Sequence, residues 1–122
     1  MPVARRSRLK QPPAPPVLHH RVYVVRLRNP LGDGRDGYYV GMTGLTPEER
    51  FDNHTRGYRS AKVVTRCGVA LAPEWYGDIP PMTFADAALC EPTLADELRD
   101  LGHLVFGPTN RPAPGQRGGK KR

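Results

Sequence analysis

Two strand-like segments joined by a strong turn sequence constrain the fold of this chain more than any other feature. Residues 21–28 (RVYVVRLR) and 38–43 (YYVGMT) are rich in β-branched and aromatic residues, which favour strands. The intervening residues 29–37 (NPLGDGRDG) combine Asn-Pro, Gly-Asp-Gly and Asp-Gly, which are turn-forming sequences. The sequence therefore predicts an antiparallel hairpin with a rather long loop.

A helix start follows the hairpin. Thr46 is a good N-cap residue, Pro47 suits the first helical position, and Glu49 completes a capping box. The helix is predicted to run to about Arg56 and to stop at Gly57.

The inner face of this helix is predicted to be partly polar. Phe51 is its only large apolar residue, so a broad apolar face cannot hold the helix in place. Arg50 and His54 are four residues apart and therefore lie on one face.

The rest of the chain is predicted to hold one longer helix and three short elements. Thr83, with Asp86 three residues on, forms a second capping sequence, and the helix that it begins ends at Gly102. The short elements are a helical turn at 61–66 and strands at 69–71 and 103–106.

A glutamate interrupts the apolar stripe of the longer helix. The stripe is expected to face the core and consists of Phe84, Ala87, Ala88, position 91, Leu94, Ala95, Leu98 and Leu101. A buried carboxylate must be paired, bound to a metal or protonated. Glu91 is therefore either a ligand for a hard metal ion or a structural residue. The structural alternatives are a salt bridge to an arginine, a rotation that exposes the side chain, and a helix break at Pro92.

The two ends of the chain differ from its middle in composition. Residues 1–20 hold five prolines and four basic residues, and residues 108–122 hold three prolines, three glycines and five basic residues. Without apolar periodicity, neither end can offset the entropy lost on ordering. We therefore predict disordered basic tails at 1–20 and 108–122 around one folded domain at 21–107.

The net charge of +7 is distributed unevenly. The tails carry nine of the 19 Lys and Arg residues and none of the 12 Asp and Glu residues. Within the domain, residues 50–66 hold a single acid, Asp52, and five basic residues, which are Arg50, Arg56, Arg59, Lys62 and Arg66. A basic patch with two basic arms favours a polyanion as partner, and the alternative is that the tails only keep the protein soluble.

The two cysteines, Cys67 and Cys90, are too few for a disulfide framework or a zinc site. The N-terminus lacks the apolar stretch of a secretory signal, and no apolar run approaches the roughly 18 residues of a membrane span. These features predict a cytoplasmic protein with reduced thiols that does not enter membranes.

The order of these motifs resembles that of the GIY-YIG nuclease superfamily. Its members carry a tyrosine on a first strand, Tyr-Ile-Gly or Tyr-Val-Gly on a second, an arginine followed by a histidine or tyrosine on the next helix, and a glutamate on a later helix. The matching residues here are Tyr23, Tyr39-Val40-Gly41, Arg50 with His54, and Glu91, so that the resemblance spans residues 21–107. It implies an α/β (α+β) fold with a small antiparallel three-stranded sheet flanked by helices.

The resemblance also implies a metal-dependent endonuclease that hydrolyses phosphodiester bonds in DNA. Glu91 would be the ligand of one Mg²⁺ (or Mn²⁺) ion, and Arg50 would bind the scissile phosphate. Tyr39 would orient or deprotonate the attacking water, while Tyr23 and His54 would complete the hydrogen-bond network. The sequence leaves Tyr39 and His54 open as the general base.

Other residues are predicted to contact the nucleic acid. Gly41 would let a phosphate or the next helix approach the backbone closely. Arg56, Arg59, Lys62 and Arg66 would hold the DNA backbone with little sequence preference, and RNA stays open as a second substrate.

Three departures from the family pattern keep two other functions open. Arg21 replaces the first glycine of the name motif, Met42 follows Gly41 where some members carry lysine, and Pro92 follows Glu91. One alternative is a catalytically inactive nucleic-acid-binding module of the same fold. The other is a small basic interaction protein in which the tyrosines are merely structural.

Overall fold

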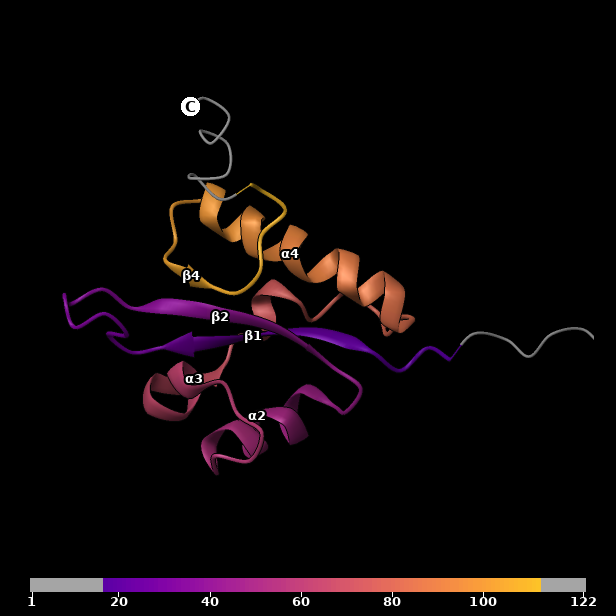
Figure 1. The fold of residues 1–122 in the computed structure, drawn as a ribbon, viewed down its shortest axis with the longest axis horizontal. Helices are drawn as coiled ribbons and strands as arrows, with labels where there is room; N and C mark the ends of the chain where they lie inside the picture. The colour runs from indigo at the N-terminus through magenta and orange to yellow at the C-terminus, as the bar shows by residue number, and fades with distance from the viewer. Residues whose placement is uncertain (1–16, 113–122) are drawn as a thin grey trace, which may run out of the picture.

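Four strands form one sheet in the computed structural model, which describes residues 17–112 (Figure 1). The strands are β1 (Arg21–Leu27), β2 (Gly37–Thr43), β3 (Gly68–Leu71) and β4 (Val105–Phe106). The helices are α2 (Pro47–Thr55), α3 (Lys62–Cys67) and α4 (Phe84–Asp100), and a 3-10 turn, η1, spans Pro73–Trp75. The predicted mixed α+β class is confirmed.

The strand order is β3-β1-β2-β4. Strand β1 pairs antiparallel with both β2 and β3, whereas β4 pairs parallel with β2. The prediction of a three-stranded antiparallel sheet was therefore wrong in the number of strands and in the direction of the last one. The physical reason is α4, which carries the chain back along the sheet so that β4 can enter in the parallel direction.

The predicted hairpin is confirmed, and its register places the two tyrosines together. Tyr23 lies opposite Gly41, and Val25 lies opposite Tyr39. Because side chains alternate between the two faces of a strand, Tyr23 and Tyr39 point to the same face of the sheet.

Helix α2 begins as its sequence predicts. The Thr46 hydroxyl accepts a hydrogen bond from the Glu49 backbone, and the Glu49 carboxylate accepts one from the Thr46 backbone, which completes the capping box. The helix ends at its cap residue Arg56, and Gly57 then takes a positive φ of 79°.

Helix α4 is continuous across Pro92, so the predicted helix break does not occur. Its start is capped by Thr83, whose hydroxyl accepts from the Asp86 backbone. The expected apolar stripe is wrong at both ends, because Phe84 is 62% exposed and Leu101 is 65% exposed. Ala88 is exposed as well, whereas Ala87, Leu94, Ala95 and Leu98 are buried as the stripe predicts.

The hairpin lies between two groups of helices. Figure 1 shows β1 and β2 running between α4 on one side and α2 with α3 on the other. The core is built from the strand residues Val24, Val25 and Val40 and from Leu94 and Leu98 of α4. Burying these side chains is the main source of stability for the sheet.

Ordered contacts extend beyond both predicted domain boundaries. His20 exchanges backbone hydrogen bonds with Met82, just before β1. At the other end, the buried carboxylate of Asp96 accepts hydrogen bonds from the Thr109 hydroxyl (2.7 Å) and the Asn110 backbone (2.9 Å). The segment after β4 is therefore fastened to α4.

Only the inner ends of the two predicted tails belong to the described part of the chain. Residues 1–16 and 113–122 lie outside it, so the disorder predicted for them stays a prediction. Among residues 17–112, every helix is too short or too polar to cross a lipid bilayer.

Candidate functional site

A hydrogen bond between Tyr23 and His54 forms the centre of the candidate site. The phenol oxygen of Tyr23 lies 2.7 Å from Nε2 of His54, and both side chains are fully buried. Tyr23 comes from the first strand of the hairpin and His54 from the last turn of α2. The bond therefore ties the helix to the sheet, at the place where a broad apolar face on α2 is missing.

The second ring nitrogen of His54 fixes the direction of this hydrogen bond. The backbone N–H of Ala61 donates to Nδ1 of His54 at 3.0 Å. Burial, assisted by the charge of Arg50, lowers the pKa of His54 from 6.5 to about 4, so the ring is neutral near pH 7. A neutral ring that accepts at Nδ1 carries its proton on Nε2, which therefore donates to Tyr23. His54 has no free lone pair with which to take a proton from water.

Tyr39 is the half-buried neighbour of this pair. Its ring centroid lies 6.2 Å from that of Tyr23 and 5.6 Å from that of His54. Burial and the charge of Glu91 raise the pKa of the Tyr39 phenol, while Arg50 and the Tyr23 hydroxyl lower it. Burial, with the neighbouring Tyr39 second, likewise raises the pKa of Tyr23. Both phenols are therefore protonated in the resting protein.

Gly41 has a structural role within the cluster. A Cβ atom at Gly41 would lie 2.6 Å from the Tyr23 phenol oxygen and 2.9 Å from Cε2 of Tyr39. In the structure the two tyrosine rings approach its backbone, and the predicted contact with a phosphate stays a prediction. Gly41 belongs to the site by making room for both phenols.

Arg50 is held in place by the loop that follows α2. Its Nη2 donates to the backbone carbonyl of Arg59 at 2.7 Å. The chain turns sharply here, because Gly57 and Arg59 have positive φ angles of 79° and 47°. A non-glycine residue in this conformation is uncommon. The guanidinium is close enough to the cluster to act on the pKa of Tyr23, Tyr39 and His54, in each case after the larger effect of burial.

Glu91 approaches the same cluster from α4. Burial raises the pKa of its carboxyl group, and its charge in turn raises the pKa of Tyr39 and, to a smaller extent, of Tyr23, for which burial is the main cause. Among the described residues, no hydrogen bond or salt bridge reaches this half-buried carboxylate, so the predicted arginine partner is not present. A half-buried carboxylate without a protein partner is a suitable ligand for a hard cation.

A metal at this place would rely on water for most of its ligands. Within residues 17–112, no three His, Cys, Asp or Glu side chains gather into a group that could hold a metal ion by themselves. The predicted ion needs only one carboxylate, because Mg²⁺ usually keeps several of its waters. Glu91 fits that role by its chemistry.

The four predicted DNA-contacting residues fall into two pairs. Arg56 forms a salt bridge with Asp52 (3.1 Å), and the guanidinium of Arg59 lies 5.4 Å above the ring of Tyr58. Lys62 and Arg66 instead line an open cavity of about 340 Å³ between α3 and the loop that joins α2 to α3. Of the four, Arg56 alone has an acidic partner among residues 17–112.

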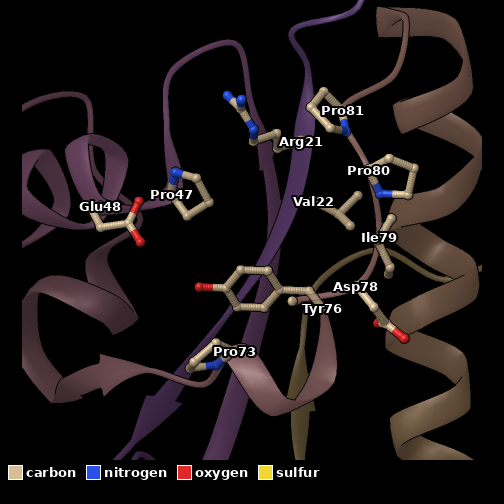
Figure 2. Close-up of a pocket in the computed structure, with 11 residues that line it drawn as sticks. Arg21, Val22, Pro47, Glu48, Pro73, Tyr76, Asp78, Ile79, Pro80 and Pro81 are labelled. Carbon is tan, nitrogen blue, oxygen red and sulfur yellow. The ribbon is translucent and has the colours of Figure 1, made fainter.

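A larger cavity of about 400 Å³ lies beside the cluster without including it (Figure 2). It lies between the start of β1, the start of α2 and the segment from η1 to Pro81. Its rim includes Arg21 and Glu48. Figure 2 shows the phenol of Tyr76 reaching across it toward the start of α2. None of the five predicted catalytic residues lines this cavity. A DNA duplex contacts a protein over a broad surface, so an open surface suits it better than such a cavity.

Sequence reasoning missed the backbone groups that support the site. The carbonyl of Arg59 and the N–H of Ala61 hold Arg50 and His54, and the Thr65 hydroxyl donates to the His54 carbonyl at 2.8 Å. Gly57 signalled a helix end, but the positive φ of Arg59 has no signature in its residue type.

Comparison with known proteins finds no matching family model, no matching curated protein and no matching solved structure. The resemblance to GIY-YIG nucleases therefore stays a prediction that rests on the residues.

Proposed function

We propose that this chain is a metal-dependent endonuclease that hydrolyses phosphodiester bonds in DNA, in the manner of the GIY-YIG nucleases that it resembles. One observation carries the proposal: two phenols, a neutral imidazole and a guanidinium form one cluster, and the Glu91 carboxylate, without a partner among residues 17–112, lies within electrostatic reach of it. The proposal includes the cytoplasmic location that the cysteine usage predicts.

Arg50 binds the scissile phosphate. A guanidinium offers a planar pair of donors that matches two phosphate oxygens, and the Arg59 carbonyl occupies only one of its N–H groups. Held at that point, the charge of Arg50 is already in place when negative charge builds up on the phosphate, so no reorganisation is needed.

Tyr39 orients the attacking water, and Tyr23 with His54 positions Tyr39. The hydrogen bonds of His54 argue against it as the base, because its Nδ1 accepts from the Ala61 backbone and its Nε2 then carries the proton. Because Nε2 of His54 donates to Tyr23, the hydroxyl proton of Tyr23 is free to act on the phenol oxygen of Tyr39, whose pKa it lowers. Of the two residues that the sequence left open, the proposal therefore assigns Tyr39 to the attacking water, as the group that orients it, since its phenol is protonated in the resting protein.

Glu91 would hold the divalent cation, Mg²⁺ or Mn²⁺, with water as the other ligands. When bound, such an ion acts as a Lewis acid that lowers the pKa of nearby water and stabilises the leaving oxygen. The raised pKa of Glu91 is consistent with a carboxylate that lacks a compensating charge in the protein alone.

A plasmid-nicking assay with and without Mg²⁺ tests the proposal. We expect the wild-type chain to nick supercoiled DNA only with the metal, and Glu91→Gln or Arg50→Ala to lower the rate by about 100-fold or more. Glu97→Gln is the matched control for the first variant, since Glu97 is an exposed acid on the same helix. Arg35→Ala, in the exposed hairpin loop, is the control for the second.

Two results would contradict the proposal. Nicking that survives in Glu91→Gln shows that the cation is not held there or not needed. Salt-sensitive DNA binding without any nicking indicates the inactive nucleic-acid-binding module instead.

A further inference from the structure

We infer that the cavity between α3 and the loop that joins α2 to α3 is a second phosphate site, which takes a backbone phosphate close to the one at Arg50. This inference rests on the proposed DNA substrate. The cavity measures about 340 Å³ and is lined by Gly57, Ser60, Lys62, Thr65 and Arg66. It has room for about ten water molecules, which is enough for a phosphate with part of its sugar.

The charges around the cavity are unbalanced. Lys62 and Arg66 are four residues apart on α3, so their like charges repel each other along one helix face. No acidic residue lines the cavity, and neither cation forms a salt bridge with any residue from 17 to 112. Arg56, the cap residue of α2 six positions before Lys62, does have such a partner in Asp52. A bound anion between Lys62 and Arg66 would relieve the repulsion.

Neutral groups at the rim complete a site for an anion. The Thr65 hydroxyl is already used, since it donates to the His54 carbonyl at 2.8 Å. Ser60 is half-buried and its hydroxyl has no partner among the described residues, so it is free to donate to a phosphate oxygen. At Gly57 the backbone is open, with no atom within 4 Å of the place a Cβ would occupy.

The cavity adjoins the cluster through one short loop. Ser60 stands between Arg59, whose carbonyl holds Arg50, and Ala61, whose N–H holds His54. A DNA strand carries a phosphate at every nucleotide, so a strand bound at Arg50 presents further phosphates along its path. The loop therefore joins the scissile phosphate to a flanking one, and contacts at the second site would set the direction of the strand.

DNA binding without divalent metal tests this site independently of cleavage. The full chain is titrated with a short duplex at several salt concentrations, as wild type, as Lys62→Ala/Arg66→Ala and as the control Arg35→Ala. We expect the double variant to reduce the slope of log K against log salt by about 1, and the control to leave it unchanged. The charge-retaining Lys62→Arg/Arg66→Lys variant should restore the wild-type slope.

Amide spectra locate the bound phosphate. With duplex added, the backbone amides of Ser60 and Thr65 should shift in the wild type and in Arg35→Ala, and stay still in Lys62→Ala/Arg66→Ala. Unshifted amides in the wild type, or equal slopes in the double variant and the control, overturn the second site. A chain that nicks DNA but fails both tests keeps its proposed function and loses only this site. A chain that passes both but never nicks keeps the site and loses the catalysis.

Discussion

Nε2 of His54 lies 2.7 Å from the phenol oxygen of Tyr23, and neither side chain touches solvent. The bond joins α2 to β1 across 31 positions of sequence. The Tyr23 oxygen is the acceptor for the buried Nε2–H of His54, while Nδ1 of the same ring accepts from the Ala61 backbone. Stability and the proposed chemistry therefore depend on the same two side chains.

Replacing the phenol tests this dependence. Tyr23→Phe leaves the Nε2 proton of His54 buried without an acceptor, and we expect a loss of about 1–3 kcal/mol in the free energy of unfolding. Denaturant unfolding measures the loss, with Tyr58→Phe as control because Tyr58 is 55% exposed. Adding His54→Leu to Tyr23→Phe should cost less than the two single changes together. Fully additive costs would mean that the hydrogen bond contributes nothing.

The buried imidazole should make stability depend on pH. The pKa of His54 is about 4 in the folded chain against an ordinary 6.5, because burial opposes its charged form. Between these values the unfolded ring binds a proton and the folded one does not. The free energy of unfolding should therefore fall as pH drops from about 6.5 to about 4, by about 3 kcal/mol in all, and level off below.

His54→Gln provides the comparison for this pH dependence. The pKa of Glu91, raised by burial, affects stability in the opposite sense, but it does so in both proteins. The difference between the two unfolding curves should show the histidine contribution alone. If the curves run parallel from pH 4 to pH 7, the ring is not buried in its neutral form.

Gly41 should tolerate no side chain. Gly41→Ala places a Cβ 2.6 Å from the Tyr23 phenol oxygen, so both tyrosine rings must move. We expect a loss of roughly 1–3 kcal/mol in the free energy of unfolding and a loss of nicking with it. Gly44→Ala is the control, since the three atoms nearest to its added Cβ belong to the His20 ring, the first at 3.3 Å, and not to the cluster. Equal stability of the two variants would show that the rings have room to spare.

Arg59 separates a side-chain role from a backbone role. Its φ of 47° suits glycine and disfavours β-branched residues, while its carbonyl holds Arg50. Arg59→Gly should therefore leave kcat for nicking unchanged and bind DNA slightly more weakly. Arg59→Val should bind DNA equally weakly and also have a lower kcat. Both variants remove the same charge. Equal kcat values would therefore show that the backbone conformation of Arg59 does not matter for catalysis and that its side chain only contributes to DNA binding.

The local signals in the sequence predicted most of the elements. Turn residues between two β-rich segments specify the hairpin, and Thr46 with Glu49 specifies the start of α2. The parallel pairing of β4 was not predictable in this way. It depends on how α4 packs, and Val105–Phe106 is too short to carry a pattern of its own.

The candidate site was predictable only as far as side chains determine it. The spacing of Arg50 and His54 placed them on one helix face. The proximity of Tyr23 and Tyr39 depends on the register of β1 and β2, which the sequence analysis did not predict. The backbone groups of Arg59 and Ala61 were not predictable, because every residue has them and only the fold aims them.

The loop over residues 57–61 also determines how freely the length of this chain can vary. Removing one residue there would shift the Arg59 carbonyl and the Ala61 amide out of line with their partners at once. The hairpin loop differs, because Asn29 bonds inward to Asp36 and Gly34 within the loop itself. Insertions, tags or a shorter two-residue turn are therefore tolerable at the tip of the hairpin and intolerable between α2 and α3.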